Sequence, residues 1–194
     1  MLSLKERIEL LEEDLIAEPP RISMTSDLPF AVLRYEPEDE WKLRKQLRLL
    51  RNRLENSGKE TVRISMADLM WESIKQSEDV KPLFDLERQR GFQAAQEQVS
   101  TYLSDPDWCP LTDLLAGRLR DFDPAETIVF LWRAAALAPA AYHISALLEQ
   151  MKGKTDVPTV LCYPGTWTGS LNFMGLKDRA TPLGSYRVKI YGRE

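Results

Sequence analysis

The first candidates for functional residues of this chain lie in the segment 160–175. Two glycines stand on either side of a short polar stretch there. Gly165 and Gly169 enclose Trp167, and Ser170 follows them. A phosphate-binding P-loop requires Gly-x-x-x-x-Gly-Lys-Ser/Thr, because the lysine reaches the outer phosphates and the hydroxyl holds magnesium. Here the glycines are one residue too close together and serine stands in the place of lysine. The segment therefore does not predict nucleotide hydrolysis.

The acidic residue that such a site also needs is missing from the neighbouring strand. Nucleotide hydrolases with a P-loop hold magnesium through an acidic residue that ends an apolar strand, whereas the apolar run 128–132 continues into Arg133. The loops after the predicted strands supply Glu36, Arg133 and the stretch 166–168 to one edge of the sheet. These residues could bind an anion, but they include no paired acid and base. We therefore expect no catalytic residue, and a degenerate nucleotide- or phosphate-binding sensor is the alternative.

Trp167 has a simpler interpretation than phosphate chemistry. A strand that stops at Pro164-Gly165 would be followed by a turn that presents the tryptophan to solvent. Exposed aromatic side chains often anchor protein interfaces. We therefore predict a partner-binding site made by Trp167, Gly165, Gly169 and Arg133.

The numbers of histidines and cysteines exclude most metal and nucleophile chemistry. The chain has one histidine, His143, and two cysteines, Cys109 and Cys162. They are too few and too widely separated for a zinc site, so we expect no metal and no cofactor. We expect His143 to be a structural residue on a helix. The two separated cysteines suggest a reduced, cytoplasmic protein without disulfides.

The bulk composition is that of a soluble globular protein. The 194 residues are 43% hydrophobic and 29% charged, with a formal net charge of −4. No apolar stretch approaches the roughly 20 residues that a membrane-spanning helix needs. The charge does not draw the whole molecule to nucleic acid.

Basic residues are nevertheless concentrated in the predicted helix 41–55. Arg44, Arg48 and Arg51 recur at helical spacing, and Lys45 lies beside them. This face could contact DNA phosphates or an acidic protein surface. Acidic residues at 36–40 precede the bases, which is the order that the helix dipole favours, so a solvated face is the competing interpretation. No aromatic residue interleaves with these bases, as binding of a single strand would require.

The elements that would position these residues alternate between strands and helices. The periodicity predicts strands at 28–35, 61–66, 127–132, 158–163 and 186–191, and helices at 4–15, 41–55, 66–74 and 139–152, with a helical insertion at 81–120. The β-α-β unit ending at residue 163 predicts neighbouring parallel strands. The fold class is therefore α/β: a single domain over 1–194, Rossmann-like, with a mostly parallel sheet of about five strands flanked by helices. The segment 81–120, between the second and third strands, would be a helical insertion or a small subdomain within it.

The glycine-containing segment also resembles a known family. The run Pro164-Gly165-x-x-x-Gly169-x-Leu171-x-Phe173-x-Gly175-Leu176-x-Asp178, followed by Tyr186-Arg187, is similar to the C-terminal signature of BrxB, a small core component of BREX bacteriophage-exclusion systems. The resemblance extends to Leu28-Pro29-Phe30, Ser65-x-x-Asp68-Leu69 and Val129-Phe130-Leu131, and so covers nearly the whole chain in order.

This resemblance implies a role in a multi-protein antiviral defence complex. The protein would be a non-catalytic adaptor or scaffold. Its partners would be other BREX proteins, especially the PglZ-type phosphatase-like protein, and also the large ATPase and the DNA methyltransferase. The family offers no catalytic residue to transfer to this sequence. Direct DNA contact through the helix 41–55 remains an alternative.

Overall fold

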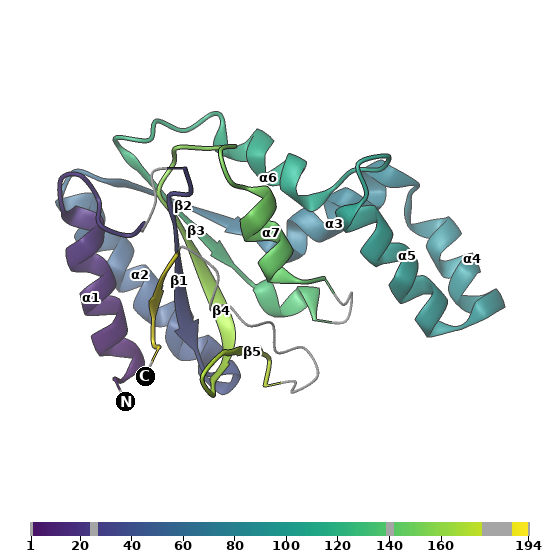
Figure 1. The fold of residues 1–194 in the computed structure, drawn as a ribbon, viewed down its shortest axis with the longest axis horizontal. Coiled ribbons are helices and arrows are strands. Elements are labelled where there is room, and N and C mark those ends of the chain that lie inside the picture. The colour runs from purple at the N-terminus through teal and green to yellow at the C-terminus, as the bar shows by residue number, and fades with distance from the viewer. Residues whose placement is uncertain (1, 24–26, 139–141, 176–187, 194) are drawn as a thin grey trace.

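The fold is built around one mostly parallel β-sheet (Figure 1). The structure is a computed structural model that describes residues 2–23, 27–138, 142–175 and 188–193. Five strands run parallel in the order β2-β3-β4-β1-β6, and β5 pairs antiparallel with the end of β4. The strands are β1 (Phe30–Tyr35), β2 (Glu60–Ser65), β3 (Thr127–Trp132), β4 (Thr159–Trp167), β5 (Leu171–Phe173) and β6 (Lys189–Tyr191).

The strand positions follow from the apolar runs of the sequence. Every residue of β1 is buried, as are the first five of β3 and the first seven of β4. Central strands of a parallel sheet are covered on both faces, so their sequences are continuously apolar instead of alternating. The strand β2 alternates and is partly exposed because it lies at one edge. The last strand, β6, lies at the other edge.

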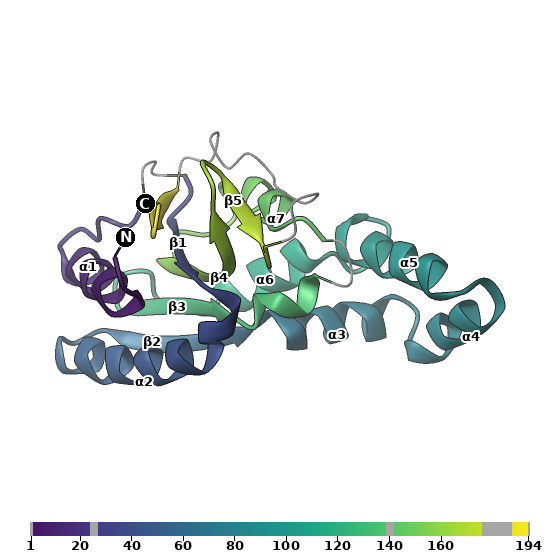
Figure 2. The same cartoon turned by 90° about the horizontal axis from the view of Figure 1, so that it is seen from below.

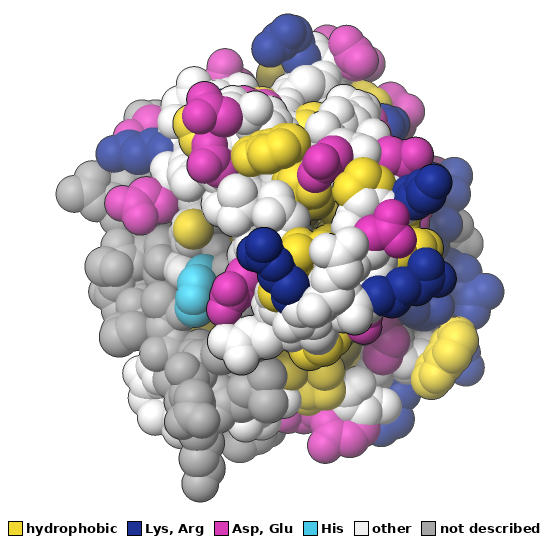
Figure 3. Space-filling model, turned by 90° about the vertical axis from the view of Figure 1, so that its right-hand side faces the viewer, with side chains coloured by type: hydrophobic (Ala, Val, Ile, Leu, Met, Phe, Trp, Pro, Cys, Tyr) yellow, Lys and Arg dark blue, Asp and Glu magenta, His cyan; other side chains and the backbone are white. Residues whose placement is uncertain are grey.

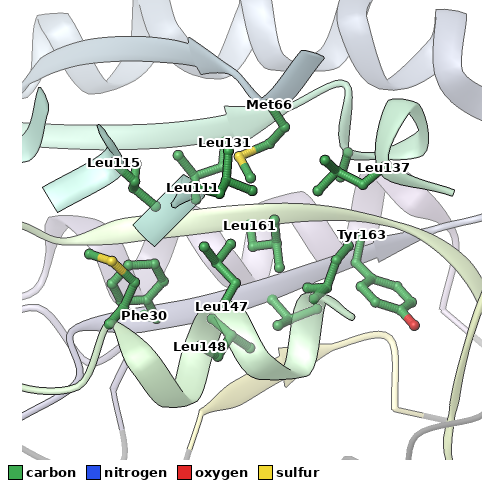
Figure 4. Packing of buried hydrophobic residues seen from close by; sticks show 14 of the residues in the cluster. Phe30, Met66, Leu111, Leu115, Leu131, Leu137, Leu147, Leu148, Leu161 and Tyr163 are labelled. Atoms are coloured by element: carbon green, nitrogen blue, oxygen red, sulfur yellow. The ribbon is translucent and has the colours of Figure 1, made fainter. Parts of the chain in front are cut away.

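Helices cover both faces of the sheet (Figures 1 and 2). On one face, α1 (Leu4–Ile16) and α2 (Glu40–Asn56) bury their leucine stripes against the strands. On the other face lie α3 (Met66–Ser77), α6 (Leu111–Leu119), the 3-10 helix η2 (Ala134–Leu137) and α7 (Ile144–Gln150). Figure 4 shows this second core, in which Leu147 and Leu148 of α7 lie near Leu161 of β4.

The helical insertion between β2 and β3 is confirmed, and part of it extends away from the sheet. The helices α4 (Val80–Arg90) and α5 (Phe92–Ser104) form a hairpin at the end of the molecule far from α1 (Figures 1 and 2). Gly91 joins them with φ of +85°, a left-handed conformation that glycine adopts without strain. Beneath the hairpin is a small separate core of Ile74, Leu83, Ala95 and Tyr102. The single-domain organisation over 1–194 stays a prediction.

Two predicted boundaries are wrong. The strand β4 does not stop at Pro164-Gly165 but continues to Trp167, because its last residues pair with β5. The helix predicted to begin at 139 begins at Ile144, and His143 is the exposed residue just before it. Residues 139–141, and the predicted start of the last strand at Tyr186-Arg187, lie outside the described residues.

The α/β class and the parallel sheet are confirmed, and the β3-α7-β4 unit has the expected neighbouring parallel strands. Helices on both faces fit the Rossmann-like part of the prediction. The strand order is not the 3-2-1-4-5-6 of the dinucleotide-binding fold. That finer similarity therefore stays a prediction.

Candidate functional site

A pocket opens at the carboxyl ends of the central strands, the edge where open parallel sheets place their ligands. Its volume is about 290 Å³. Tyr35 ends β1 and Pro164 belongs to β4, while Arg133 directly follows β3. The remaining lining residues are Pro37, Glu40, Arg44, Ala135, Ala136 and Met174. The pocket thus combines two arginines with one carboxylate and an apolar floor.

Glu40 fixes the polar side of this pocket. It accepts a hydrogen bond of 2.8 Å from Arg44 Nε and one of 2.5 Å from the Tyr35 hydroxyl. Burial, and then the neighbouring Glu40, raise the pKa of Tyr35 well above its ordinary value. Tyr35 therefore keeps its proton and serves as a hydrogen-bond donor. The arrangement holds Arg44 in place and leaves no free general base at this point.

Trp132, at the end of β3, is surrounded by three arginines from three different elements. The guanidinium carbons of Arg44, Arg63 and Arg133 lie 5.1, 5.4 and 5.9 Å from the centroid of its ring. Arg44 also lies 4.7 Å from the ring centroid of Trp41, which is 75% exposed. The result is a Trp–Arg–Trp stack beside the pocket.

The structure divides the predicted basic face into two parts. Arg44 and Arg51 form ion pairs of 2.8 and 2.6 Å with Glu40 and Glu55, four residues away in each case. Lys45 and Arg48 are exposed and form no ion pair with a described residue. The solvated-face interpretation therefore fits Arg51, whereas Lys45 and Arg48 retain unneutralised charge.

The predicted glycine loop is a β-hairpin. Gly165 is buried in β4, where an added Cβ would come within 2.3 Å of the Asn172 carbonyl oxygen and 2.7 Å of the Tyr163 ring. Gly169 has φ of +84° in the turn between the strands. Both glycines are therefore required by the backbone path and by the close approach of β5. No phosphate-cradling loop exists at this position.

The other two predicted contact residues have different surroundings. Trp167 is half-buried against the main core, with the Arg193 guanidinium carbon 5.7 Å from its ring centroid. Arg133 has φ of +59°, pairs with Asp68 at 3.2 Å and lines the pocket. Arg133 therefore joins Arg44 at the strand ends, whereas Trp167 belongs to the hairpin. Their role in partner binding stays a prediction.

A second surface, which the sequence did not predict, lies between α3 and the α4–α5 hairpin. It is an apolar groove of about 320 Å³. Three aromatic side chains on it are exposed: Trp71 by 44%, Phe84 by 50% and Phe92 by 61%. Figure 3 faces this end of the molecule and shows hydrophobic side chains among acidic and basic ones. The other lining residues are Met70, Ile74, Leu83, Glu87, Ala95, Gln96, Val99 and Ala136.

Arg34 shows how the strand ends are held together. Its side chain is charged but only 1% exposed, and it is the second-to-last residue of the buried strand β1. Arg34 donates hydrogen bonds to the carbonyl oxygens of Gly192, at 2.7 Å, and Gly165, at 3.1 Å, and it pairs with Glu36. One buried arginine thus ties β1 to the segment after β6 and to the hairpin. A charge inside a predicted buried strand was the signal for this role.

Possible metal ligands do not cluster in the described part of the chain. Among the described residues, no group of three histidine, cysteine, aspartate or glutamate side chains could hold a metal ion. Cys162 is fully buried, and its burial raises the pKa of the thiol well above the ordinary value. No helix in the described ranges is long and apolar enough to cross a bilayer.

The fold and these surfaces define an α/β protein with a parallel sheet, a polar pocket at the strand ends and an apolar groove on a helical insertion. The chain belongs to the BrxB family: the family model described as "BREX protein BrxB" matches residues 62–189, from β2 into β6. This match confirms the resemblance seen in the sequence. No match was found among curated proteins or among solved structures. Family membership makes the protein a component of BREX phage defence that associates with other BREX proteins.

Proposed function

We propose that this protein is a non-catalytic adaptor of the BREX machinery and that the apolar groove is where a partner docks. The observation that carries the proposal is the exposure of three aromatic side chains, Trp71, Phe84 and Phe92, on one groove. Clustered exposed apolar side chains of this kind mark interaction sites. The absence of a paired acid and base among the described residues of the pocket supports a binding role over a catalytic one.

The shape of the groove favours an amphipathic helix of the partner. The walls are the helices α3, α4 and α5 with Ala136 of η2, and the lining is apolar except for Glu87 and Gln96. A helix that presents apolar residues at i, i+3 or i+4, and i+7 fills such a groove, while its polar face stays in solvent. Aromatic residues in a desolvated centre contribute most of the affinity of such interfaces. We propose the PglZ-type phosphatase-like protein as the first partner, with the large ATPase and the methyltransferase as further candidates.

Purification of the tagged protein from cells that express the neighbouring BREX genes tests this proposal. The Phe84→Glu/Phe92→Glu variant should lose the partner, because two charges would be placed in the apolar contact. Leu10→Glu is the matched control: Leu10 is 45% exposed but lies on α1, away from the groove. Far-ultraviolet circular dichroism should show that both variants are folded. Retention of every BREX protein by the folded groove variant would refute the docking site.

The pocket at the strand ends favours a second function, a sensor of an anionic ligand. The position of the pocket and its two arginines, Arg44 and Arg133, support this alternative. The segment around Gly165 does not support it, because that segment is a β-hairpin without a phosphate-binding loop. A nucleotide at about 100 times its dissociation constant would add about 2.7 kcal/mol to the free energy of unfolding. Thermal denaturation with nucleotides and with inorganic phosphate measures this shift, and an unchanged melting temperature with all of them would remove the sensor function.

A further inference from the structure

The structure places an aromatic platform beside unpaired cations on α2. Trp41, Lys45 and Arg48 follow one another at i, i+4 and i+7, so they lie on one face of the helix. At about 1.5 Å per residue, the three side chains span about 10 Å along the helix axis. All three are exposed. Together with Arg63 on the neighbouring edge strand β2, they form what we call the α2 stripe.

Trp41 is held as a platform although it is 75% exposed. The guanidinium carbon of Arg44 lies 4.7 Å from its ring centroid, and the same carbon lies 5.1 Å from the ring centroid of Trp132. Glu40 in turn fixes Arg44 through a 2.8 Å bond. The indole therefore rests on a positioned guanidinium. Its high exposure leaves indole surface available to a further planar group.

The charges of the stripe are not neutralised within the described part of the chain. Lys42, Arg44 and Arg53 form ion pairs with Asp39, Glu40 and Glu12. Lys45, Arg48 and Arg63, in contrast, have no carboxylate partner among the described residues; Arg63 only contacts Trp132. An acidic protein thus carries two available cations, Lys45 and Arg48, on the same helix face as an exposed tryptophan, and a third, Arg63, beside Trp132 on the neighbouring strands.

We propose that the α2 stripe binds single-stranded nucleic acid, with a base stacked on Trp41 and phosphates on Lys45, Arg48 and Arg63. Stacking on an aromatic ring beside cations that follow the backbone is how proteins bind single strands without reading their sequence. In a duplex the bases are stacked on one another and their faces are closed to Trp41. An acidic protein segment would satisfy the cations but would not use the flat indole. The proposal is independent of the adaptor function and of the groove.

Fluorescence anisotropy with labelled oligonucleotides of about 16 nucleotides tests this inference. The probes are a mixed-sequence DNA strand, the same sequence as RNA, and the corresponding DNA duplex. We expect tighter binding of the single strands than of the duplex, with the DNA and RNA arms showing which strand is preferred. With about three phosphates contacted, the slope of log K against log salt should be about −2. Absence of binding at low salt, or equal binding of the duplex, would overturn the proposal.

Two variants separate stacking from charge. Trp41→Ala should weaken binding about tenfold with little change in the salt slope, whereas Lys45→Gln/Arg48→Gln should weaken binding and make the slope shallower. Lys75→Gln/Arg90→Gln is the control, because it removes the same number of positive charges at exposed positions on α3 and α4. If Trp41→Ala binds like the wild type, or if polyglutamate competes as well as the strand, the stripe recognises negative charge alone and the inference is wrong.

Discussion

The apolar groove and the α2 stripe are both exposed surfaces, but their supports are different. The groove lies between α3 and the α4–α5 hairpin, over a small core of four buried residues, Ile74, Leu83, Ala95 and Tyr102. The stripe lies on α2, whose opposite face buries a complete leucine stripe against the sheet. Changes to the groove can therefore loosen its support, whereas changes to the stripe alter the surface of a firmly packed helix.

The two surfaces also differ in their relation to the family. Every residue of the groove falls within the range 62–189 that the family model matches, whereas only Arg63 of the stripe does. In the proposed functions, apolar burial would provide the affinity of the groove for its partner, and salt-dependent contacts would provide the affinity of the stripe for a strand. A partner bound in the groove should therefore resist salt, and a strand on the stripe should not.

The largest effect is expected from the support of the stripe. Leu50 is fully buried beneath α2, so Leu50→Ala should lower the free energy of unfolding by about 3 kcal/mol through lost burial and a remaining cavity. Leu83→Ala, beneath the groove, should cost less, because Leu83 packs in a cluster of only four buried residues that can close around the change. Urea denaturation measures the free energy of unfolding of both variants, and an m-value equal to that of the wild type would show that only stability has changed.

The neighbouring leucine provides the control for this difference. Leu49 lies on the same helix but is 45% exposed, so Leu49→Ala should change the free energy of unfolding by less than about 0.5 kcal/mol. If Leu83→Ala costs as much as Leu50→Ala, the groove is as firmly supported as the stripe and the contrast between the two surfaces fails.

A smaller effect is expected from Tyr102, which ties the hairpin core to the end of α3. Its hydroxyl donates a 2.5 Å hydrogen bond to Glu78 Oε2. Removing this bond by Tyr102→Phe should lower the free energy of unfolding by about 1 kcal/mol near pH 8. Leu10→Ala on α1, at an exposed position, is a control that should have little effect on stability.

The same tyrosine predicts a pH dependence with a defined sign. Burial, and then Glu78, raise the pKa of Tyr102 to about 12. A group whose pKa is raised by folding stabilises the protein fully below its unfolded pKa, about 10 for tyrosine, and this contribution is lost as the pH rises through the folded value. The difference between the wild type and Tyr102→Phe should therefore narrow between about pH 10 and about pH 12. Urea denaturation at pH 8 and pH 11 measures it, and a constant difference would contradict the assigned role.

The sequence predicted the supports better than the surfaces. The helix 41–55 was predicted because helical periodicity is a local property of the sequence. The buried leucines of this helix, at the helical spacing, are Leu43, Leu47, Leu50 and Leu54. Likewise, the apolar run 127–132 is β3 at the predicted positions. The end of β4 was mistaken for a turn because Pro-Gly usually ends a strand, whereas here β5 supplies the pairing that continues it.

The surfaces depend on contacts between distant segments. Trp132 meets Arg63 because Ser65 is in register with Trp132 across β2 and β3, and the register of a strand pair cannot be read from either strand alone. The statement that no aromatic residue accompanies the bases of helix 41–55 was wrong, because Trp41 lies in this helix and its ring centroid is 4.7 Å from the Arg44 guanidinium carbon. Phe92 lies in the predicted helical insertion 81–120, but its exposure depends on where α4 lies. Of the predicted site residues, Arg44 and Arg133 meet at the pocket, while Gly165 and Gly169 serve the hairpin.

The smallest effect sharpens the definition of the stripe. Arg51 lies one turn beyond Arg48 but forms a 2.6 Å ion pair with Glu55, at an exposed position where such pairs contribute only a few tenths of a kcal/mol. Arg51→Gln should therefore leave the free energy of unfolding nearly unchanged, and it should weaken binding of a single strand less than Arg48→Gln does. Anisotropy titrations of the two variants at one salt concentration measure the difference. Equal losses of affinity would mean that the whole basic face of α2 contacts the strand. In that case the ion pair with Glu55 would not prevent Arg51 from binding a phosphate, because the phosphate could replace the carboxylate at little cost in free energy.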